Sequence, residues 1–131
     1  MVFVDTSVWI DFFREASTSK VNRLEQLLND EVDIFTTGII LQELLNGIKN
    51  KGQRAAVKDA MMRYVLIMPS FNTHIQAAEI FDGCRKKGIT IRSPIDCLIA
   101  ALALEYDLPI LENDRDFLSI SKIFPLRIIE A

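Results

Sequence analysis

The chain has 131 residues, half of them hydrophobic, which predicts one domain over residues 1–131 with an apolar core. No apolar run reaches the ~20 residues of a membrane span, and no basic segment precedes a long apolar stretch at the N-terminus. We therefore expect no membrane anchor, no signal peptide and a cytoplasmic location. The formal net charge of −3 argues, at face value, against a nucleic-acid partner.

The first half of the chain alternates strand patterns with helix patterns. Residues 2–5 predict a short buried strand, and apolar residues at helical spacing after it predict a helix. Thr6 or Ser7 is the expected N-cap of that helix. The next predicted elements are a helix at about 18–29, a strand at 33–37, a helix at 38–50 and a helix at 53–64.

The second half continues this alternation. A strand at 65–69 stops at Pro69, and a helix at 72–88 is closed by Gly88. A helix at 93–107 is apolar nearly all round, which predicts deep burial. The last predicted elements are a strand at 108–113, a short helical turn at 114–120 and a strand at 125–130. Strands alternating with helices indicate an α/β fold with a mainly parallel sheet.

Four acidic residues occupy positions that can converge. Asp5 ends the first strand, and Asp114 follows the strand "PILE" and Asn113. Asp96 opens the buried helix, and Glu43 lies beside the apolar stripe of the helix after "DIFTT". In an open α/β sheet, ligands bind beyond the carboxyl ends of the strands. We therefore expect these four side chains to face one crevice.

Four carboxylates in one crevice require a compensating charge. Like charges raise one another's pKa values or recruit a cation, and hard oxygen ligands select Mg²⁺ or Mn²⁺. No histidine or cysteine cluster accompanies the acids, which argues against zinc. A metal held by carboxylates can activate water for hydrolysis of a phosphodiester. The pattern therefore predicts a metal site at Asp5.

Each of these acids also has a purely structural interpretation. Asp96 stands in Ser93-x-x-Asp96, which is a capping-box pattern. Asp114 and Asp116 can cap the short helix that follows them, and Glu43 can face solvent. Asp5 can accept hydrogen bonds from the first N–H groups of its helix. Cys84 and Cys97 lie in helical patterns without C-x-x-C spacing, so reduced and buried thiols are expected.

Three blocks of sequence carry a resemblance to a known family. They are "VFVDTSVWIDFF" (2–13), "LQELLNGI" (41–48) and "GITIRSPIDCLIAALALEYDLPILENDRDF" (88–117). Together they resemble the PIN-domain ribonucleases, most closely the VapC-type toxins of toxin–antitoxin pairs. The last block is the most specific of the three. The resemblance implies a PIN-like three-layer α/β/α fold, with helices on both sides of a mainly parallel sheet.

The resemblance also implies a function and its residues. It implies a Mg²⁺- or Mn²⁺-dependent endoribonuclease that acts on RNA, is blocked by a cognate VapB-like antitoxin and forms a homodimer. The catalytic and metal-binding set falls on Asp5, Glu43, Asp96 and Asp114. Further members of the site are Thr6, Ser7, Asn113 and Asp116. The residue before the Asn-Asp pair, usually a threonine or similar in this family, is Glu112, which adds a negative charge near the site.

A bound metal would weaken the argument that the net charge makes against a nucleic-acid partner. Neutralising the four proposed acids converts −3 to +1. Four basic residues precede the Asp96 helix and can follow an RNA backbone: Arg85, Lys86, Lys87 and Arg92. Five more basic residues lie along the helix predicted at 53–64 and just before it: Lys49, Lys51, Arg54, Lys58 and Arg63. A solvated helix face with basic residues at its C-terminal end can explain either group. It explains the 49–63 group at least as well as RNA binding does, whereas the position of Arg85 to Arg92 near Asp96 favours RNA binding.

Other functions fit the pattern less well. A haloacid-dehalogenase-type phosphatase requires a second acid two residues after the first, where this chain has Ser7. A receiver domain requires a paired acid and a late lysine that the sequence does not supply. The alternative from another class is a non-catalytic PIN-like module that binds RNA or protein. A chain acting chiefly inside an operon-repressing complex is a further possibility.

Overall fold

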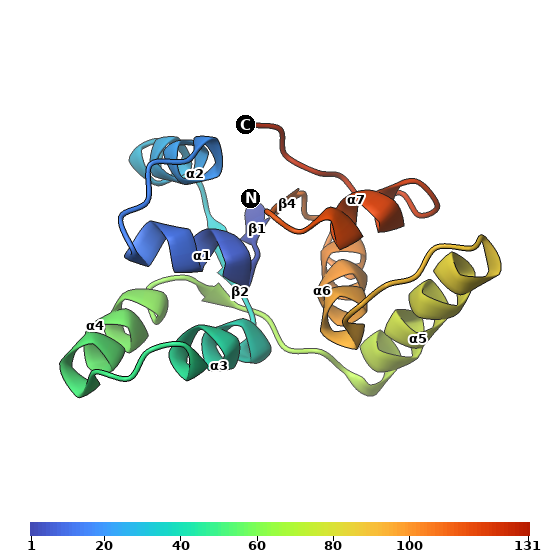
Figure 1. Cartoon of the computed structure of the whole chain (residues 1–131), viewed down its shortest axis with the longest axis horizontal. Coiled ribbons are helices and arrows are strands. Elements are labelled where there is room, and N and C mark those ends of the chain that lie inside the picture. The colour runs from blue at the N-terminus through green and yellow to red at the C-terminus, as the bar shows by residue number, and fades with distance from the viewer. The chain divides into compact units, whose positions relative to one another are not determined.

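Strands and helices alternate along the chain as the sequence predicts (Figure 1). The computed structural model describes residues 1–131. The elements in chain order are β1 (Val2–Val4), α1 (Thr6–Phe13), α2 (Ser19–Asn29), β2 (Ile34–Thr36), α3 (Gly38–Asn46), α4 (Lys51–Met61), β3 (Val65–Leu66), α5 (Phe71–Lys86), α6 (Pro94–Glu105), β4 (Ile110–Leu111) and α7 (Arg115–Ser121). No helix is long and apolar enough to cross a membrane.

The four strands form one sheet in the order β3-β2-β1-β4. β1 pairs in parallel with β2, placing Val2 opposite Ile34, and β2 pairs in parallel with β3, placing Phe35 opposite Val65. Parallel neighbours cannot be joined by tight hairpins, so helices form the connections between them. The predicted α/β class with a mainly parallel sheet is confirmed.

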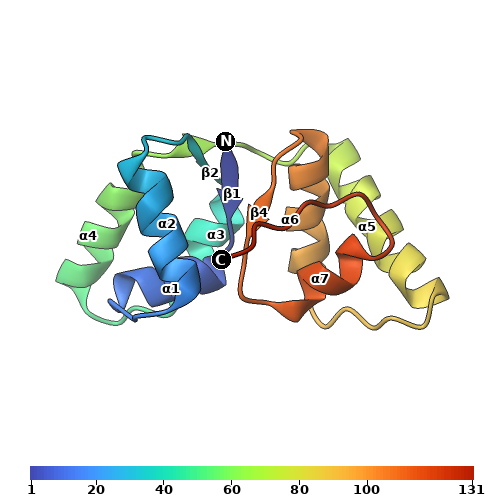
Figure 2. The same cartoon turned by 90° about the horizontal axis from the view of Figure 1, so that it is seen from above.

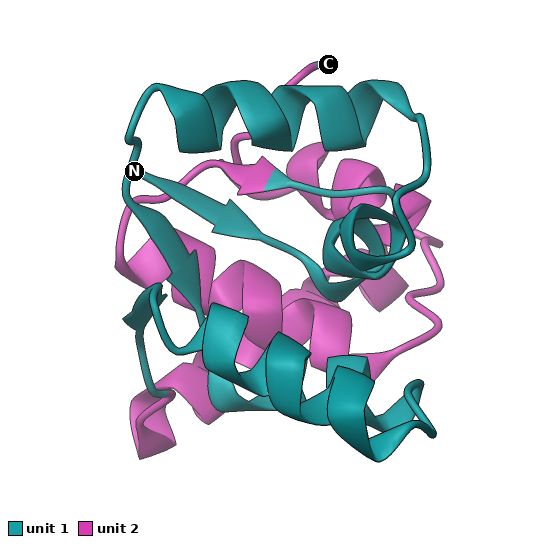
Figure 3. Ribbon diagram, turned by 90° about the vertical axis from the view of Figure 1, so that its left-hand side faces the viewer, with its two compact units in different colours: residues 1–68, 111–113, 131 teal, residues 69–110, 114–130 magenta.

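The chain divides into two compact units (Figure 3). The first contains residues 1–68, 111–113 and 131, and the second contains residues 69–110 and 114–130. The predicted single domain over residues 1–131 stays a prediction.

In the first unit, helix α1 packs against α2 and α3, and α3 packs against α4. Phe3, Trp9 and Leu24 are fully buried in the core of this unit. The predicted N-cap of α1, Thr6 or Ser7, is wrong, because the cap is Asp5, whose carboxylate accepts a hydrogen bond from the Ser7 N–H. A single residue separates β1 from α1, so the residue that ends the strand must also cap the helix.

In the second unit, α5 and α6 lie side by side (Figure 2). Ser93 caps α6 by accepting from the Ile95 N–H, and Pro94 occupies the first helical position, as predicted. The capping box of this unit lies on α5, where Ser70 and Thr73 satisfy each other's backbone N–H groups. Seven of the twelve residues of α6 are buried, which confirms its predicted depth.

The predicted last strand at 125–130 is wrong. Only Ile128 forms a bridge, with Ile110. Pro125 has no N–H, and the Leu126 N–H donates to the Phe124 oxygen at 2.7 Å, so neither can extend a ladder. The buried thiols are confirmed: both cysteines are free and buried, and burial raises the pKa of Cys97 to about 12.

Candidate functional site

Asp5 lies at the carboxyl end of β1 and is only 6% exposed. Its backbone N–H donates to the Leu111 oxygen at 3.0 Å, which ties it to β4. Its Oδ2 accepts from the Ser7 hydroxyl at 2.8 Å and from the Ser7 N–H at 3.4 Å. The carboxylate is therefore held in one orientation by the first turn of α1, as the structural interpretation of Asp5 expected.

Glu43 approaches this first turn from α3. The Thr6 hydroxyl donates to Glu43 Oε1 at 2.9 Å, although 37 residues separate the two in sequence. Glu43 is half-buried, so its interpretation as a solvent-facing helix residue is wrong. The hydrogen bond fixes the Glu43 carboxylate beside the end of β1.

The electrostatics of Asp5 indicate that these two carboxylates interact. Burial raises the pKa of Asp5, because the charged form loses water. Hydrogen bonds from Ser7 and from the Thr6 backbone oppose this rise, and the charge of Glu43 adds to it. The structure therefore brings Asp5 and Glu43 together in the first unit, where a cation would relieve their repulsion.

Asn113 joins the same network through its backbone and its side chain. The Asn113 N–H donates to the Ser7 hydroxyl at 3.2 Å, and its Nδ2 donates to Asp11 Oδ2 at 3.1 Å. The sequence interpretation missed Asp11. Its position four residues after Ser7 on a predicted helix was the available signal, because such residues share a helix face. Glu112, the departure from the family pattern, is 3% exposed in the same unit.

Replacing Ser7 by Ala is expected to destabilise the fold by about 1–2 kcal/mol, because the buried Asp5 carboxylate loses a hydrogen-bond donor. The Ser7 hydroxyl bridges Asp5 and Asn113, so its loss leaves the Asp5 carboxylate with backbone N–H donors alone. Urea unfolding measures the effect. Ser17→Ala in the exposed loop before α2 is the control, expected within about 0.5 kcal/mol of the parent. Equal stability of the two variants would contradict this role of Ser7.

A second acidic group lies in the second unit. One carboxylate oxygen from each of Asp96, Asp114 and Asp116 lies within 4.8 Å of the others. Asp96 is in the first turn of α6, and Asp114 and Asp116 are at the start of α7, so residues 18 or more apart meet here. Asp96 and Asp116 are buried, and Asp114 is half-buried. The structure therefore adds Asp116 to Asp96 and Asp114 as a close neighbour.

Asp114 also has the capping role that the sequence allowed. Its Oδ1 accepts from the Asp116 N–H at 2.9 Å and so caps α7. The Arg92 N–H donates to Asp116 Oδ2 at 3.2 Å. The Arg92 guanidinium reaches Asp114 Oδ1 at 3.4 Å and Asp116 Oδ2 at 3.7 Å. Capping and backbone contacts fix these carboxylates close together.

The donor chemistry of this cluster fits a hard divalent cation. Its three side chains offer only carboxylate oxygens, the ligands that Mg²⁺ and Mn²⁺ prefer. No protein nitrogen or sulfur ligand completes the group, which keeps zinc disfavoured. Asp96, Asp114 and Asp116 are therefore the residues that could hold the metal in this unit.

The basic residues before α6 have different surroundings. Arg85 and Lys86 pair with Asp82 on the same helix, at 2.5 and 3.0 Å, and these contacts lower the pKa of Asp82. This is the solvated helix face that the sequence allowed, and Lys87 is the C-cap of α5. Arg92 alone among the four predicted RNA-binding residues contacts the acidic cluster.

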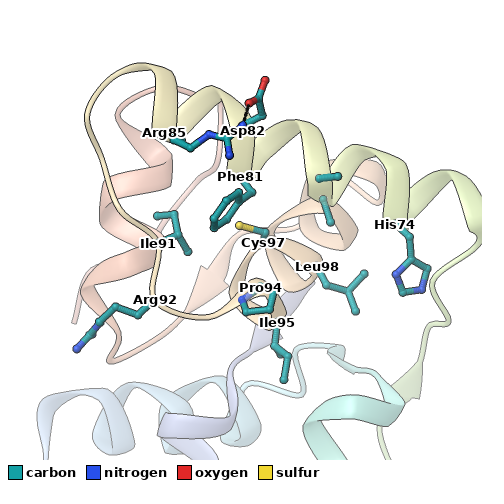
Figure 4. Close-up of a pocket in the computed structure, with 12 residues that line it drawn as sticks. His74, Phe81, Asp82, Arg85, Ile91, Arg92, Pro94, Ile95, Cys97 and Leu98 are labelled. Carbon is teal, nitrogen blue, oxygen red and sulfur yellow. Dashed lines mark hydrogen bonds and ion pairs between the residues drawn. The ribbon is translucent and has the colours of Figure 1, made fainter.

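A cavity of about 720 Å³ lies in the second unit between α5 and the start of α6 (Figure 4). Its lining is mainly apolar and includes Phe81, Ile91 and Leu98, with His74 at one end. None of the three clustered carboxylates lines it. The cavity therefore has an apolar lining and contains none of the carboxylates of the acidic cluster.

Comparison with known proteins shows which family this chain belongs to. The PIN domain family matches residues 2–123. The chain belongs to the PIN-domain family. A VapC ribonuclease of Mycobacterium bovis and the ribonuclease VapC11 of Mycobacterium tuberculosis are each 32% identical to it, over 97% of this chain and 96% of the relative. The resemblance predicted from the three sequence blocks is confirmed.

Solved structures share the fold of this PIN domain. VapBC2 from Rickettsia felis, bound to a DNA fragment from its promoter, matches 98% of each chain with a TM-score of 0.77 at 21% identity. VapC20 of Mycobacterium tuberculosis, a toxin that cleaves the sarcin–ricin loop, matches 97% of this chain and 99% of its own, with a TM-score of 0.73 at 16% identity. The predicted PIN-like α/β/α fold is confirmed.

Proposed function

We propose that this PIN domain is a metal-dependent endoribonuclease of the VapC toxin type that hydrolyses RNA phosphodiester bonds. The observation that carries the proposal is the meeting of Asp96, Asp114 and Asp116 within 4.8 Å, in a chain with VapC ribonucleases as relatives. The proposed catalytic and metal-binding residues are Asp5, Glu43, Asp96 and Asp114, with Asp116 as a further ligand.

The proposed roles follow from the chemistry of these side chains. A bound Mg²⁺ or Mn²⁺ ion would supply a water of lowered pKa and stabilise negative charge on the phosphate. Asp96, Asp114 and Asp116 would bind the ion through carboxylate oxygens. Asp5 and Glu43, oriented by Ser7 and Thr6, would accept protons or orient water. Asn113, whose N–H donates to the Ser7 hydroxyl, holds that hydroxyl next to Asp5.

The proposed partners follow from the relatives and from the surface. A cognate VapB-like antitoxin is supported by relatives that were solved as toxin–antitoxin complexes, including VapBC2. A homodimer is supported by large apolar side chains that remain exposed on α5, among them Phe71, Ile75 and Phe81. Exposed apolar patches of this kind mark protein interfaces. A cytoplasmic location is the expected setting for an RNA substrate.

Purified protein freed of antitoxin is expected to cleave members of a structured-RNA pool with Mg²⁺ or Mn²⁺, and to stop when EDTA is added. Asp5→Asn is expected to lower cleavage by at least about 100-fold, because a carboxylate at the reaction centre is lost. Asparagine keeps the volume and capping ability of Asp5, so circular dichroism should show an unchanged fold. RNA fragments separated on a denaturing gel measure the effect.

Three outcomes would contradict the proposal. An unfolded Asp5→Asn variant would assign Asp5 a structural role. Folded parent protein that binds RNA without cutting it, whatever the metal, would favour the non-catalytic module. Cleavage that persists in EDTA would exclude the metal from the reaction.

A further inference from the structure

The Arg92 guanidinium lies on the same carboxylates that we propose for the metal. Nη2 is 3.4 Å from Asp114 Oδ1, and Nε is 3.7 Å from Asp116 Oδ2. The Arg92 backbone N–H donates to that same Asp116 oxygen at 3.2 Å, so the residue is anchored at its base. Arg92 is one of the residues that line the apolar cavity, and Figure 4 shows its guanidinium extending away from Phe81 and Cys97.

A nearby positive charge stabilises the ionised form of this acidic cluster. Three carboxylates whose oxygens lie within 4.8 Å repel one another unless positive charge is close. Arg92 supplies one positive charge to two of them. A divalent ion bound among these oxygens would lie a few ångströms from the guanidinium, where two cations repel. The arginine and the ion therefore oppose each other at these oxygens.

The guanidinium is held loosely enough to leave. Its two contacts are longer than the 2.7–2.9 Å typical of strong charge-assisted hydrogen bonds. The Arg92 side chain is 62% exposed, whereas that of Asp116 is 6% exposed, so the arginine covers the cluster from the solvent side. Exposed ion pairs of this kind contribute little free energy and exchange readily with solvent.

We propose that Arg92 is the internal counter-ion of the metal-free cluster and competes with the divalent ion for Asp114 and Asp116. When the ion binds, the guanidinium is released and binds a phosphate of the RNA, for which its planar fork of donors is suited. The inference rests on the proposed function, because it requires the cluster to be the metal site. In this account Arg92 is a substrate-binding residue.

The first test measures binding of Mn²⁺ alone to metal-free protein, from the EPR signal of free Mn²⁺. Arg92→Gln is expected to bind Mn²⁺ about three- to tenfold more tightly than the parent, because the competing charge is removed. The matched control is Arg127→Gln. Arg127 has a similarly exposed side chain and pairs with Asp107, outside the cluster, so its variant should bind Mn²⁺ like the parent.

The second test measures RNA cleavage at saturating Mn²⁺. Arg92→Gln is expected to raise the KM for RNA by about tenfold and to change kcat by less than about threefold, because a phosphate contact is lost and the reacting groups remain. A purely structural role for Arg92 would not tighten Mn²⁺ binding. Circular dichroism of both variants confirms that they are folded.

The outcomes separate this inference from the proposed function. Unchanged or weaker Mn²⁺ binding by folded Arg92→Gln, with Mn²⁺ bound by the parent, would overturn the competition and leave the nuclease in place. Absence of Mn²⁺ binding by the parent and by both variants would overturn both. Tighter Mn²⁺ binding by Arg92→Gln in a protein that cuts no RNA would support the competition and remove the proposed nuclease.

Discussion

Replacing Asp96 by Asn is expected to reduce RNA cleavage by at least about 100-fold and to weaken Mn²⁺ binding by at least about tenfold. The substitution removes a charge from the three-carboxylate cluster but keeps the shape of the side chain. Ser93, and not Asp96, provides the oxygen that accepts from the Ile95 N–H, so the side-chain N-cap of α6 survives. Stability should change by less than about 1 kcal/mol, because removing one of three close negative charges offsets lost local contacts.

The matched control for this prediction is Asp107→Asn. Asp107 is 93% exposed at its side chain and pairs with Arg127, so the charge change is the same and the cluster is untouched. The positive φ of 53° at Asp107 also suits asparagine. Cleavage and Mn²⁺ binding by Asp107→Asn should equal those of the parent. Full cleavage by Asp96→Asn would show that the Asp96 carboxylate is not required for the reaction.

Replacing Trp9 by Ala is expected to destabilise the protein by about 3–5 kcal/mol, the usual cost of deleting a large buried aromatic side chain. Trp9 is fully buried on α1, and its ring lies 5.0–5.8 Å from the rings of Phe12, Phe13 and Tyr64. The same helix begins with Thr6 and Ser7, so a loosened core also releases the donors that orient Glu43 and Asp5. Urea unfolding measures the change.

Trp9→Phe separates aromatic packing from the polar atom of the indole. The Trp9 Nε1–H is buried without an acceptor, so phenylalanine removes an unsatisfied donor while it keeps an aromatic ring. We expect a loss below about 1.5 kcal/mol for this variant. A loss below about 1 kcal/mol for Trp9→Ala would show that the aromatic cluster is peripheral to the stability of the first unit.

Local pattern was sufficient to predict most elements of this chain. The sequence patterns predicted six helices and a short helical turn where α7 lies, because an amphipathic or buried helix repeats every 3.6 residues wherever it packs. Ser93, Pro94 and Gly88 marked helix ends through backbone chemistry that depends only on near neighbours. The failures were the cap of α1 and the strand at 125–130. The cap prediction failed because a single residue, Asp5, joins β1 to α1. The strand prediction failed because a strand needs backbone pairing with a distant segment, and here only Ile128 pairs, with Ile110.

For the acidic residues, the sequence predicted the type of site but not the contacts of each side chain. Their positions after strands and at helix starts, with the family resemblance, were enough to predict a hard-metal site and its residue types. The sequence could not assign the neighbours of each carboxylate, because side-chain contacts span up to 106 residues in this chain. Only the tertiary structure joined Thr6 to Glu43, Asn113 to Asp11 and Arg92 to Asp114 and Asp116. Residue types determine which ion and which reaction are chemically possible, and three-dimensional packing decides which charges meet.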